Sequence, residues 1–237
     1  MIFPVEGHAK QGHSQQQGFS REWDDAFRAS RSMSQWPWSD VVSLCSRHLP
    51  RGAQPLRVLE LGPGIGANIP FFESLGACYH AVEGSPAMTE RLWERFPALR
   101  DRVVAGDFTK SIPFAGPFDI ILDRASLTHN TTESIRAGLG LVRERLSAEG
   151  RFIGIDWFST AHGDFPFGIP AGDLYTRKDF PSRQFQGVGR VHFSDEGHLR
   201  DLFREFALLS LEHKRSERVQ PVGVATMAAW NLVAGLP

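Results

Sequence analysis

A glycine-rich loop preceded by an acidic residue is the clearest chemical feature of the sequence. Residues 58–68 read Val-Leu-Glu-Leu-Gly-Pro-Gly-Ile-Gly-Ala-Asn, an apolar strand that runs into glycines and then into a helix. Glycines allow backbone N–H groups to approach a ligand closely, because no Cβ lies in the way. Gly62, Gly64 and Ala67 also fit a dinucleotide-binding loop. A tight turn without any ligand is a third interpretation.

Three acidic residues near this loop favour a cationic ligand that contains a nucleoside. Glu60 lies two residues before the first glycine, where a carboxylate would repel a pyrophosphate but attract an amino group. Glu83, 21 residues after Gly62, can accept hydrogen bonds from both hydroxyls of a ribose. Asp107 is followed by Phe108, so a carboxylate can accept from an adenine amino group while the ring packs on the base. A helix or turn cap is the alternative role for Asp107.

The segments that position these residues alternate as in an α/β sheet. Short β-rich runs are separated by amphipathic stretches, which predicts parallel strands joined by crossover helices. The last two β-like runs, 207–217 and 224–234, are joined by a short link, so they should be antiparallel neighbours. The other predicted strands are 57–62, 78–83, 103–106, 118–123 and 151–158.

Caps and stop signals predict where the helices begin. Ser85 should cap a helix that ends before Pro97, Asn130 should open a second helix, and Ser194 a third. Two earlier helices are expected over 20–32 and 39–49, the second with Ser39 as its N-cap, and together residues 20–50 form an N-terminal helical cap. Residues 1–19 have the composition of a flexible tail, so 20–237 should form a single domain.

Composition excludes several classes of protein. No apolar run approaches the length needed to cross a bilayer, and no secretory signal is present at the N-terminus. The 26 Lys and Arg residues nearly balance the 27 Asp and Glu residues, which argues against a nucleic-acid partner. Cys45 and Cys78 fit neither a metal site nor a disulfide framework. We therefore expect a cytoplasmic protein that binds neither metal, membrane nor nucleic acid.

With these motifs in order, the chain resembles a class I S-adenosylmethionine-dependent methyltransferase over roughly residues 57–235. The resemblance implies a doubly wound, mostly parallel sheet of seven strands in the order 3-2-1-4-5-7-6, with the last strand antiparallel. One departure is Ser147-Ala148-Glu149-Gly150, a surface loop where the family has Lys-Pro-Gly-Gly before strand five. The implied cofactor is S-adenosyl-L-methionine, and the implied contacts are Glu60, Gly62, Gly64, Gly66, Asn68, Glu83, Gly84, Asp107, Phe108 and Asp123.

Candidates for chemistry on the methyl acceptor follow the fourth and fifth strands. Methyl transfer is an in-line displacement that needs alignment and sometimes a base for the acceptor's proton. His129 is the first choice for that base, because imidazole titrates near neutrality. A histidine that only packs or caps the next helix is the alternative. Asp156 and His162 complete the catalytic candidates.

Residues 159–193 have no convincing regular element but are rich in aromatic and basic residues. Loops this long in compact domains are usually functional or disordered, and the aromatic residues argue against disorder. We interpret the segment as an acceptor-side insert, with 23–38 covering the cofactor from the other side. The basic residues are compatible with an acidic or phosphorylated acceptor. A solvated loop whose aromatic rings pack on the sheet is an equal alternative.

The resulting expectation is a stand-alone enzyme, similar to bacterial small-molecule methyltransferases, that methylates oxygen or nitrogen. A sugar or a metabolic intermediate is a candidate acceptor. Two alternatives stay open. A nicotinamide-dependent oxidoreductase could use the same glycines, although Glu60 counts against it, and a methyltransferase-like protein could bind the cofactor without catalysis.

Overall fold

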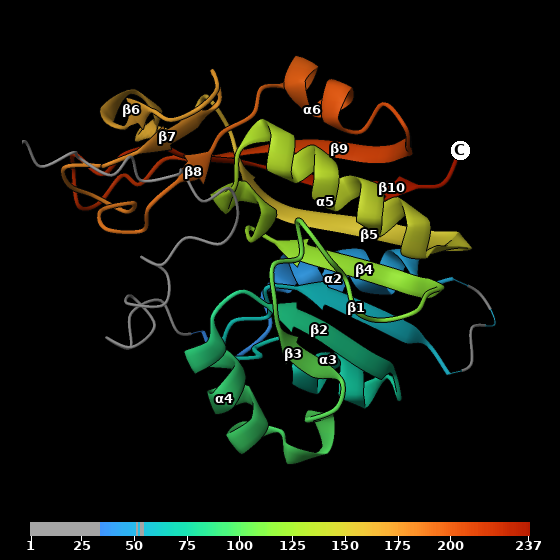
Figure 1. The fold of residues 1–237 in the computed structure, drawn as a ribbon. Coiled ribbons are helices and arrows are strands. Elements are labelled where there is room, and N and C mark those ends of the chain that lie inside the picture. The colour runs from blue at the N-terminus through green and yellow to red at the C-terminus, as the bar shows by residue number, and fades with distance from the viewer. Residues whose placement is uncertain (1–33, 51, 53–54) are drawn as a thin grey trace, which may run out of the picture.

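The computed structural model describes residues 34–50, 52 and 55–237. The expected tail and the expected helix 20–32 lie outside the described residues. Figure 1 shows one large sheet through the centre of the protein, helices on both of its faces and a smaller sheet at one end.

The central sheet has seven strands in the order β3-β2-β1-β4-β5-β10-β9. The first five pair in parallel, whereas β10 is antiparallel to both β5 and β9. The predicted strand order and the reversed last strand are therefore confirmed. The strands are β1 (Arg57–Leu61), β2 (Cys78–Glu83), β3 (Val103–Ala105), β4 (Phe118–Arg124), β5 (Leu146–Phe158), β9 (Ala207–Ser216) and β10 (Met227–Gly235).

Apolar side chains on both faces of β1 explain why this strand lies inside the sheet. Leu59 and Leu61 belong to the core under α5 (Thr132–Arg145) and α6 (Glu196–Leu202). Val58 belongs to the core on the opposite face, under α2 (Ser39–His48), α3 (Ile69–Ser74) and α4 (Pro86–Arg95). Because successive side chains of a strand point to opposite faces, a doubly covered strand needs apolar side chains on both faces, and Glu60 is the one buried charged residue of β1.

The helix starts differ slightly from those expected. Ser85 does cap α4, because its Oγ accepts from the Met88 N–H at 3.1 Å. The α5 cap is Thr131, since the Asn130 amide instead donates to the Ser126 and Leu127 carbonyls of the preceding 3₁₀ turn, Leu127–His129.

Two other expected caps are also shifted. Asp195 caps α6 in place of Ser194, with Oδ1 accepting from the His198 N–H at 2.7 Å. Ser39 is the first residue of α2, and Trp38 occupies the cap position without a side-chain bond. The 3₁₀ turns outside the sheet are η1 (Pro97–Leu99), η2 (Leu127–His129) and η3 (Phe165–Phe167).

The segment expected to lack regular structure contains a small antiparallel sheet. Its strands are β6 (Ile169–Pro170), β7 (Thr176–Lys178) and β8 (Val191–His192). These strands are only two or three residues long, too short to produce a readable alternation. They pack on an aromatic cluster of Phe158, Phe180, Phe185, Val191 and Phe193.

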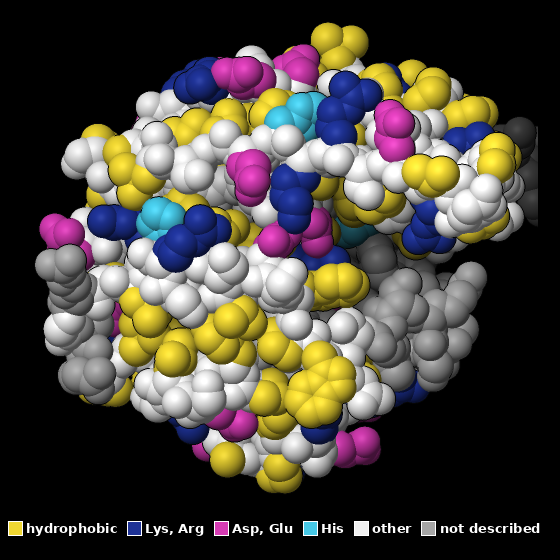
Figure 2. Space-filling model, turned by 180° about the vertical axis from the view of Figure 1, so that it is seen from behind, with side chains coloured by type: hydrophobic (Ala, Val, Ile, Leu, Met, Phe, Trp, Pro, Cys, Tyr) yellow, Lys and Arg dark blue, Asp and Glu magenta, His cyan; other side chains and the backbone are white. Residues whose placement is uncertain are grey.

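A second difference is that β5 already begins at Leu146, so the expected surface loop 147–150 is strand, interrupted by a register shift. None of the described helices has the length and apolar character needed to cross a membrane. On the face seen in Figure 2, basic and acidic side chains are interspersed across the upper half, and hydrophobic side chains gather below them.

Candidate active site

One cavity of about 920 Å³ lies at the carboxyl ends of β1, β2, β4 and β5. This is where ligands bind in open α/β sheets. Most of the predicted site residues line it: Glu60, Gly62, Gly64, Asn68, Glu83, Gly84, Asp107, Phe108, His129 and Asp156. We call the wall formed by residues 60–68, 83–84 and 106–108 the glycine-loop half. The wall formed by Trp38, Asp40, Arg124, Asp156 and Lys214 is the ion-pair half.

The glycines of the loop have conformations that other residues rarely adopt. Gly62 has φ +64° and Gly64 has φ +57°, both in the left-handed region. A Cβ on Gly64 would meet no atom within 4 Å, so the loop backbone borders open space there. The Gly62 N–H donates to the Val82 carbonyl at 2.8 Å, which ties the loop to the end of β2.

Glu83 holds the glycine loop from the neighbouring strand. Its Oε2 accepts from the Gly64 N–H at 2.9 Å, and its Oε1 accepts from the Ser85 N–H at 2.8 Å. Burial raises the pKa of Glu83 to about 7, although these N–H donors favour the ionised form. The carboxylate keeps lone pairs that further donors can use.

Glu60 is buried and held by two neighbours. Its Oε2 accepts from the Tyr79 hydroxyl at 2.6 Å, and its Oε1 accepts from Asn68 Nδ2 at 2.7 Å. Burial raises the pKa of Glu60, and both hydrogen bonds oppose that shift. Because Asn68 uses its amide nitrogen here, its Oδ1 is a buried acceptor without a partner among the described residues. The sequence analysis did not identify Tyr79 as a site residue, because a tyrosine within a predicted strand looks like part of the hydrophobic core.

Asp107 combines the two roles that the sequence left open. Its Oδ1 accepts from the Thr109 N–H at 3.0 Å and from the Thr109 hydroxyl at 2.6 Å, so it caps a turn. Lys110 Nζ lies 3.2 Å from Oδ2. Asp107 also lines the cavity together with the buried ring of Phe108. The turn therefore places a carboxylate and an aromatic ring at the same end of the cavity.

Three predicted residues do not line the cavity. Gly66 lies against Ile69 and Leu92, where a Cβ would come within 3 Å of either side chain. Asp123 is fully buried, and its carboxylate accepts from the Leu127 N–H at 2.9 Å and from Trp157 Nε1 at 2.8 Å. Asp123 therefore holds Leu127 and Trp157 by hydrogen bonds and does not line the cavity. Burial raises the pKa of Asp123 to about 7.

His162 is the third of these residues. Its ring is buried behind Phe158 and Phe185, and its Nδ1 accepts from the Asp164 N–H at 3.0 Å. Its Nε2 lies 3.2 Å from Met227 Sδ. Phe158, Phe185 and Met227 line the cavity, so His162 supports the wall from behind.

His129 lies in the cavity wall between the two halves. Its Nδ1 is 2.9 Å from the Arg190 carbonyl, which can only accept, so the neutral ring carries its proton on Nδ1. Burial lowers the pKa of His129 to about 4. The imidazole is therefore neutral at pH 7, with its acceptor lone pair on Nε2.

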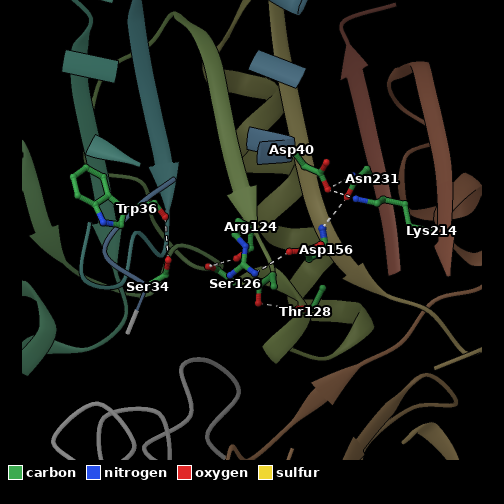
Figure 3. Close-up of polar contacts among 10 residues, drawn as sticks. Ser34, Trp36, Asp40, Arg124, Ser126, Thr128, Asp156, Lys214 and Asn231 are labelled. Carbon is green, nitrogen blue, oxygen red and sulfur yellow. Dashed lines mark hydrogen bonds and ion pairs between the residues drawn. The ribbon is translucent and has the colours of Figure 1, made fainter. Parts of the chain in front are cut away.

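The ion-pair half joins residues from five elements. Arg124 lies 2.8 Å from Asp156 and over the ring of Trp38, 4.0 Å from its centroid. Lys214 forms an ion pair with Asp40 (Figure 3). Asn231 connects these pairs, because its amide donates to Asp40 at 3.2 Å and its Oδ1 accepts from the Asp156 N–H at 3.1 Å.

The sequence offered a signal for Arg124, which ends the fourth strand, but none for Asp40, Lys214 or Asn231. Residues 34–38 are the described part of the segment expected to cover the cofactor, and Ser34 and Trp38 line the cavity. From the insert, Gln184, Phe185 and Val188 also line the cavity.

The basic residues of the insert lie elsewhere. Arg177 and Arg183 stack over Phe165 and Phe167, and Arg183 also pairs with Asp164. None of the basic residues Arg177, Lys178, Arg183 and Arg190 is among the described residues that line the cavity. These side chains therefore give no support to an acidic acceptor.

Comparison with known proteins agrees with this geometry. Residues 58–150 match the family model of a methyltransferase domain. This segment, less than half of the chain, is similar to a methyltransferase domain, and the chain shares the fold of class I methyltransferases. The match spans β1 to the start of β5, including the glycine loop, Glu83 and Asp107. The oxidoreductase alternative has no such support. A search of curated proteins gave no match.

Solved methyltransferase structures resemble most of the chain. A SAM-dependent methyltransferase of Methanosarcina mazei has a TM-score of 0.64 at 15% identity, covering 85% of this chain and 99% of its own. One from Clostridium acetobutylicum has a TM-score of 0.61 at 16% identity, covering 91% and 96%. The glycopeptide N-methyltransferase MtfA with sinefungin has a TM-score of 0.58 at 19% identity, covering 84% and 86%. At these identities the likeness shows the shared fold.

Proposed function

We propose that the protein transfers the methyl group of S-adenosylmethionine to a nitrogen or oxygen atom of a small molecule. One observation carries this proposal: a single cavity extends from the glycine loop of the methyltransferase domain to the aromatic wall of Phe158 and Phe185. Its volume of about 920 Å³ lies near the top of the roughly 300–1,000 Å³ range of ligand pockets. Cofactor and acceptor can therefore share it.

The residues of the glycine-loop half fit this cofactor. Open space beside Gly64 lets the ligand approach the backbone, and Glu83 has lone pairs for the ribose hydroxyls. Asp107 and Phe108 offer an acceptor and a ring for adenine. Asn68 adds a buried acceptor oxygen next to Glu60, suited to the amino group of the methionine part.

The cofactor supplies a methyl group activated by a sulfonium, so the protein mainly has to align the acceptor. Phe158 and Phe185 give this part of the cavity an apolar wall that excludes water. His129 lines the cavity, and its lowered pKa of about 4 makes it a weak base, so we propose that it orients the acceptor and does not deprotonate it.

Isothermal titration calorimetry tests the proposal. The purified protein should bind S-adenosylhomocysteine and should show no heat with NADH, because the acids of the glycine-loop half repel a pyrophosphate. Binding of NADH without a response to S-adenosylhomocysteine would refute the proposal. A protein that binds the cofactor product but shows no turnover with any acceptor would fit the non-catalytic alternative.

A further inference from the structure

We propose that the acceptor presents a primary or secondary amine, which Asp156 binds in the ion-pair half and from which it takes a proton. This inference rests on the proposed methyl transfer and names the acceptor class that the same cavity would take. The supporting observation is that both cations of the ion-pair half are already paired with carboxylates.

Both cations of the ion-pair half are engaged. The Arg124 guanidinium pairs with Asp156 through one terminal nitrogen and its face lies on Trp38, while its Nε is buried without a hydrogen-bond partner among the described residues. Lys214 pairs with Asp40. An anionic acceptor would have to displace a carboxylate from one of these cations, and it would then lie beside that carboxylate. Like charges at such short range repel each other.

The carboxylates of the whole cavity also outnumber its cations. Among the described lining residues, Asp40, Asp107 and Asp156 stand against Arg124 and Lys214 even when the more deeply buried Glu60 and Glu83 are protonated. Because the cavity lining carries an excess of negative charge, it binds a cationic acceptor more favourably than an anionic one.

Asp156 offers an open oxygen for that cation. Arg124 contacts only Oδ2, and no described residue makes a hydrogen bond to Oδ1. The backbone of Asp156 has φ +56°, an uncommon conformation for a residue with a side chain, and Asn231 holds its N–H. Such local strain concentrates at functional sites, because the surrounding structure must maintain it. Figure 3 shows Asp156 between Arg124 and the Asn231 contact.

Aromatic rings complete a site for an amine with an apolar body. Phe158 and Phe185 pack at 4.8 Å between centroids and line the same cavity as Asp156. Ring faces attract ammonium groups as well as apolar groups. The combination of one carboxylate oxygen and these rings matches an arylalkylamine better than a carboxylic acid of the same shape.

The chemical step follows from this placement. The bound ammonium gives a proton to Asp156 Oδ1, which frees the nitrogen lone pair. The nitrogen attacks the methyl carbon, the carbon–sulfur bond breaks with its electron pair left on sulfur, and the product is an N-methylammonium ion. The proton on Asp156 then leaves to solvent, so each turnover releases one proton.

Three probes that share a phenylethyl body test the inference: 2-phenylethylamine, 2-phenylethanol and 3-phenylpropionate, titrated by NMR into protein saturated with S-adenosylhomocysteine. The amine should bind at least tenfold more tightly than the other two. In Asp156→Asn that preference should disappear, and the acid should gain affinity because Arg124 loses its partner. Affinity for S-adenosylhomocysteine should stay within threefold.

Asp201→Asn is the matched control, since Asp201 is also a half-exposed carboxylate paired with an arginine, Arg136, but lies outside the cavity. It should leave all three affinities unchanged. Equal binding of the probes, tighter binding of the acid, or no binding of any probe would overturn the amine assignment. Failure of the wild type to bind S-adenosylhomocysteine would instead count against the proposed methyl transfer.

Discussion

The two halves of the cavity are built in different ways. The glycine-loop half comes from one stretch of chain, 60–108, in which consecutive parallel strands end side by side. The ion-pair half joins Asp40 at the start of α2 to Lys214 on β9, 174 residues later. A site made from neighbouring strand ends suits a constant ligand. A site made from distant elements can change with any one of them, which suits the part that selects an acceptor.

The two halves of the cavity also differ in how deeply their charged side chains are buried. Glu60 and Glu83 are almost fully buried, and backbone or side-chain donors hold them. The Arg124–Asp156 and Asp40–Lys214 pairs are 30–42% exposed at their side chains. Exposed ion pairs contribute little to stability, so the ion-pair half can rearrange around a ligand at small cost. Substitutions in the glycine-loop half should therefore lower stability or cofactor affinity. Substitutions in the ion-pair half should mainly change acceptor binding.

The largest effect is expected from Gly62→Ala. Its Cβ would lie 2.3 Å from Ser126 Oγ, at a φ of +64° that side chains disfavour. Backbone strain and overpacking together should lower the free energy of unfolding by about 2–5 kcal/mol. Urea denaturation measures this.

Gly140→Ala provides the control, because Gly140 is exposed within α5 and a Cβ there meets no atom within 4 Å. That variant should gain about 0.5–1 kcal/mol. Equal stability of the two variants would show that the loop is less tightly packed than the structure has it.

Glu83→Ala should have the next largest effect, on cofactor affinity. It removes the carboxylate that holds Gly64 and that would accept the ribose hydroxyls. We expect a loss of about 2–4 kcal/mol in affinity for S-adenosylhomocysteine, measured by calorimetry. Glu83→Gln should lose less, since the amide keeps one acceptor oxygen. Wild-type affinity in Glu83→Ala would mean that Glu83 is only a loop support.

The contrast between the halves also decides what the sequence could predict. The strands and the glycine-loop half follow from apolar runs and from the glycines and acids at their ends, whereas the strand order was implied by the resemblance to class I methyltransferases. The caps were misplaced by one residue where two polar residues adjoin, as at Asn130 and Thr131, because only the folded turn decides which of them is free to cap. Sequence patterns report local conformation, so neighbouring polar residues cannot be ranked from them.

The ion-pair half could not be predicted, since no local pattern relates Asp40 to Lys214. The insert was missed for another reason. Its strands, such as Val191–His192, are short and gain stability from Phe158 and Phe193, which a period-based prediction does not see. The resemblance implied a cofactor contact for Asp123, but its carboxylate is buried and accepts from Trp157 Nε1.

A smaller effect is expected from pH, again in the glycine-loop half. Ribose hydroxyls would donate to ionised Glu83, whereas free Glu83 has a pKa raised to about 7. Binding would therefore lower this pKa and release a proton below pH 7. Affinity for S-adenosylhomocysteine should rise up to about tenfold per unit as pH increases toward 7, then level off.

Calorimetry in buffers with different ionisation enthalpies measures the proton release directly. Glu83→Gln should bind with no such pH dependence in this range. Proton release that persists in Glu83→Gln would assign the titration to another group.

The smallest effect on cofactor affinity is expected in the insert, where two phenylalanines form a matched pair. Phe185 and Phe180 are both buried in the same aromatic cluster, with centroids 5.4 Å apart, but only Phe185 lines the described cavity. Either replacement by leucine should reduce stability by about 1–1.5 kcal/mol. Affinity for S-adenosylhomocysteine should stay within about threefold, under ~0.7 kcal/mol, in both. Only Phe185→Leu should weaken 2-phenylethylamine binding, because Phe180 touches no ligand. A tenfold loss of S-adenosylhomocysteine affinity in Phe185→Leu would place the insert with the glycine-loop half, whereas equal losses of amine binding would mean that the cluster acts only through its packing.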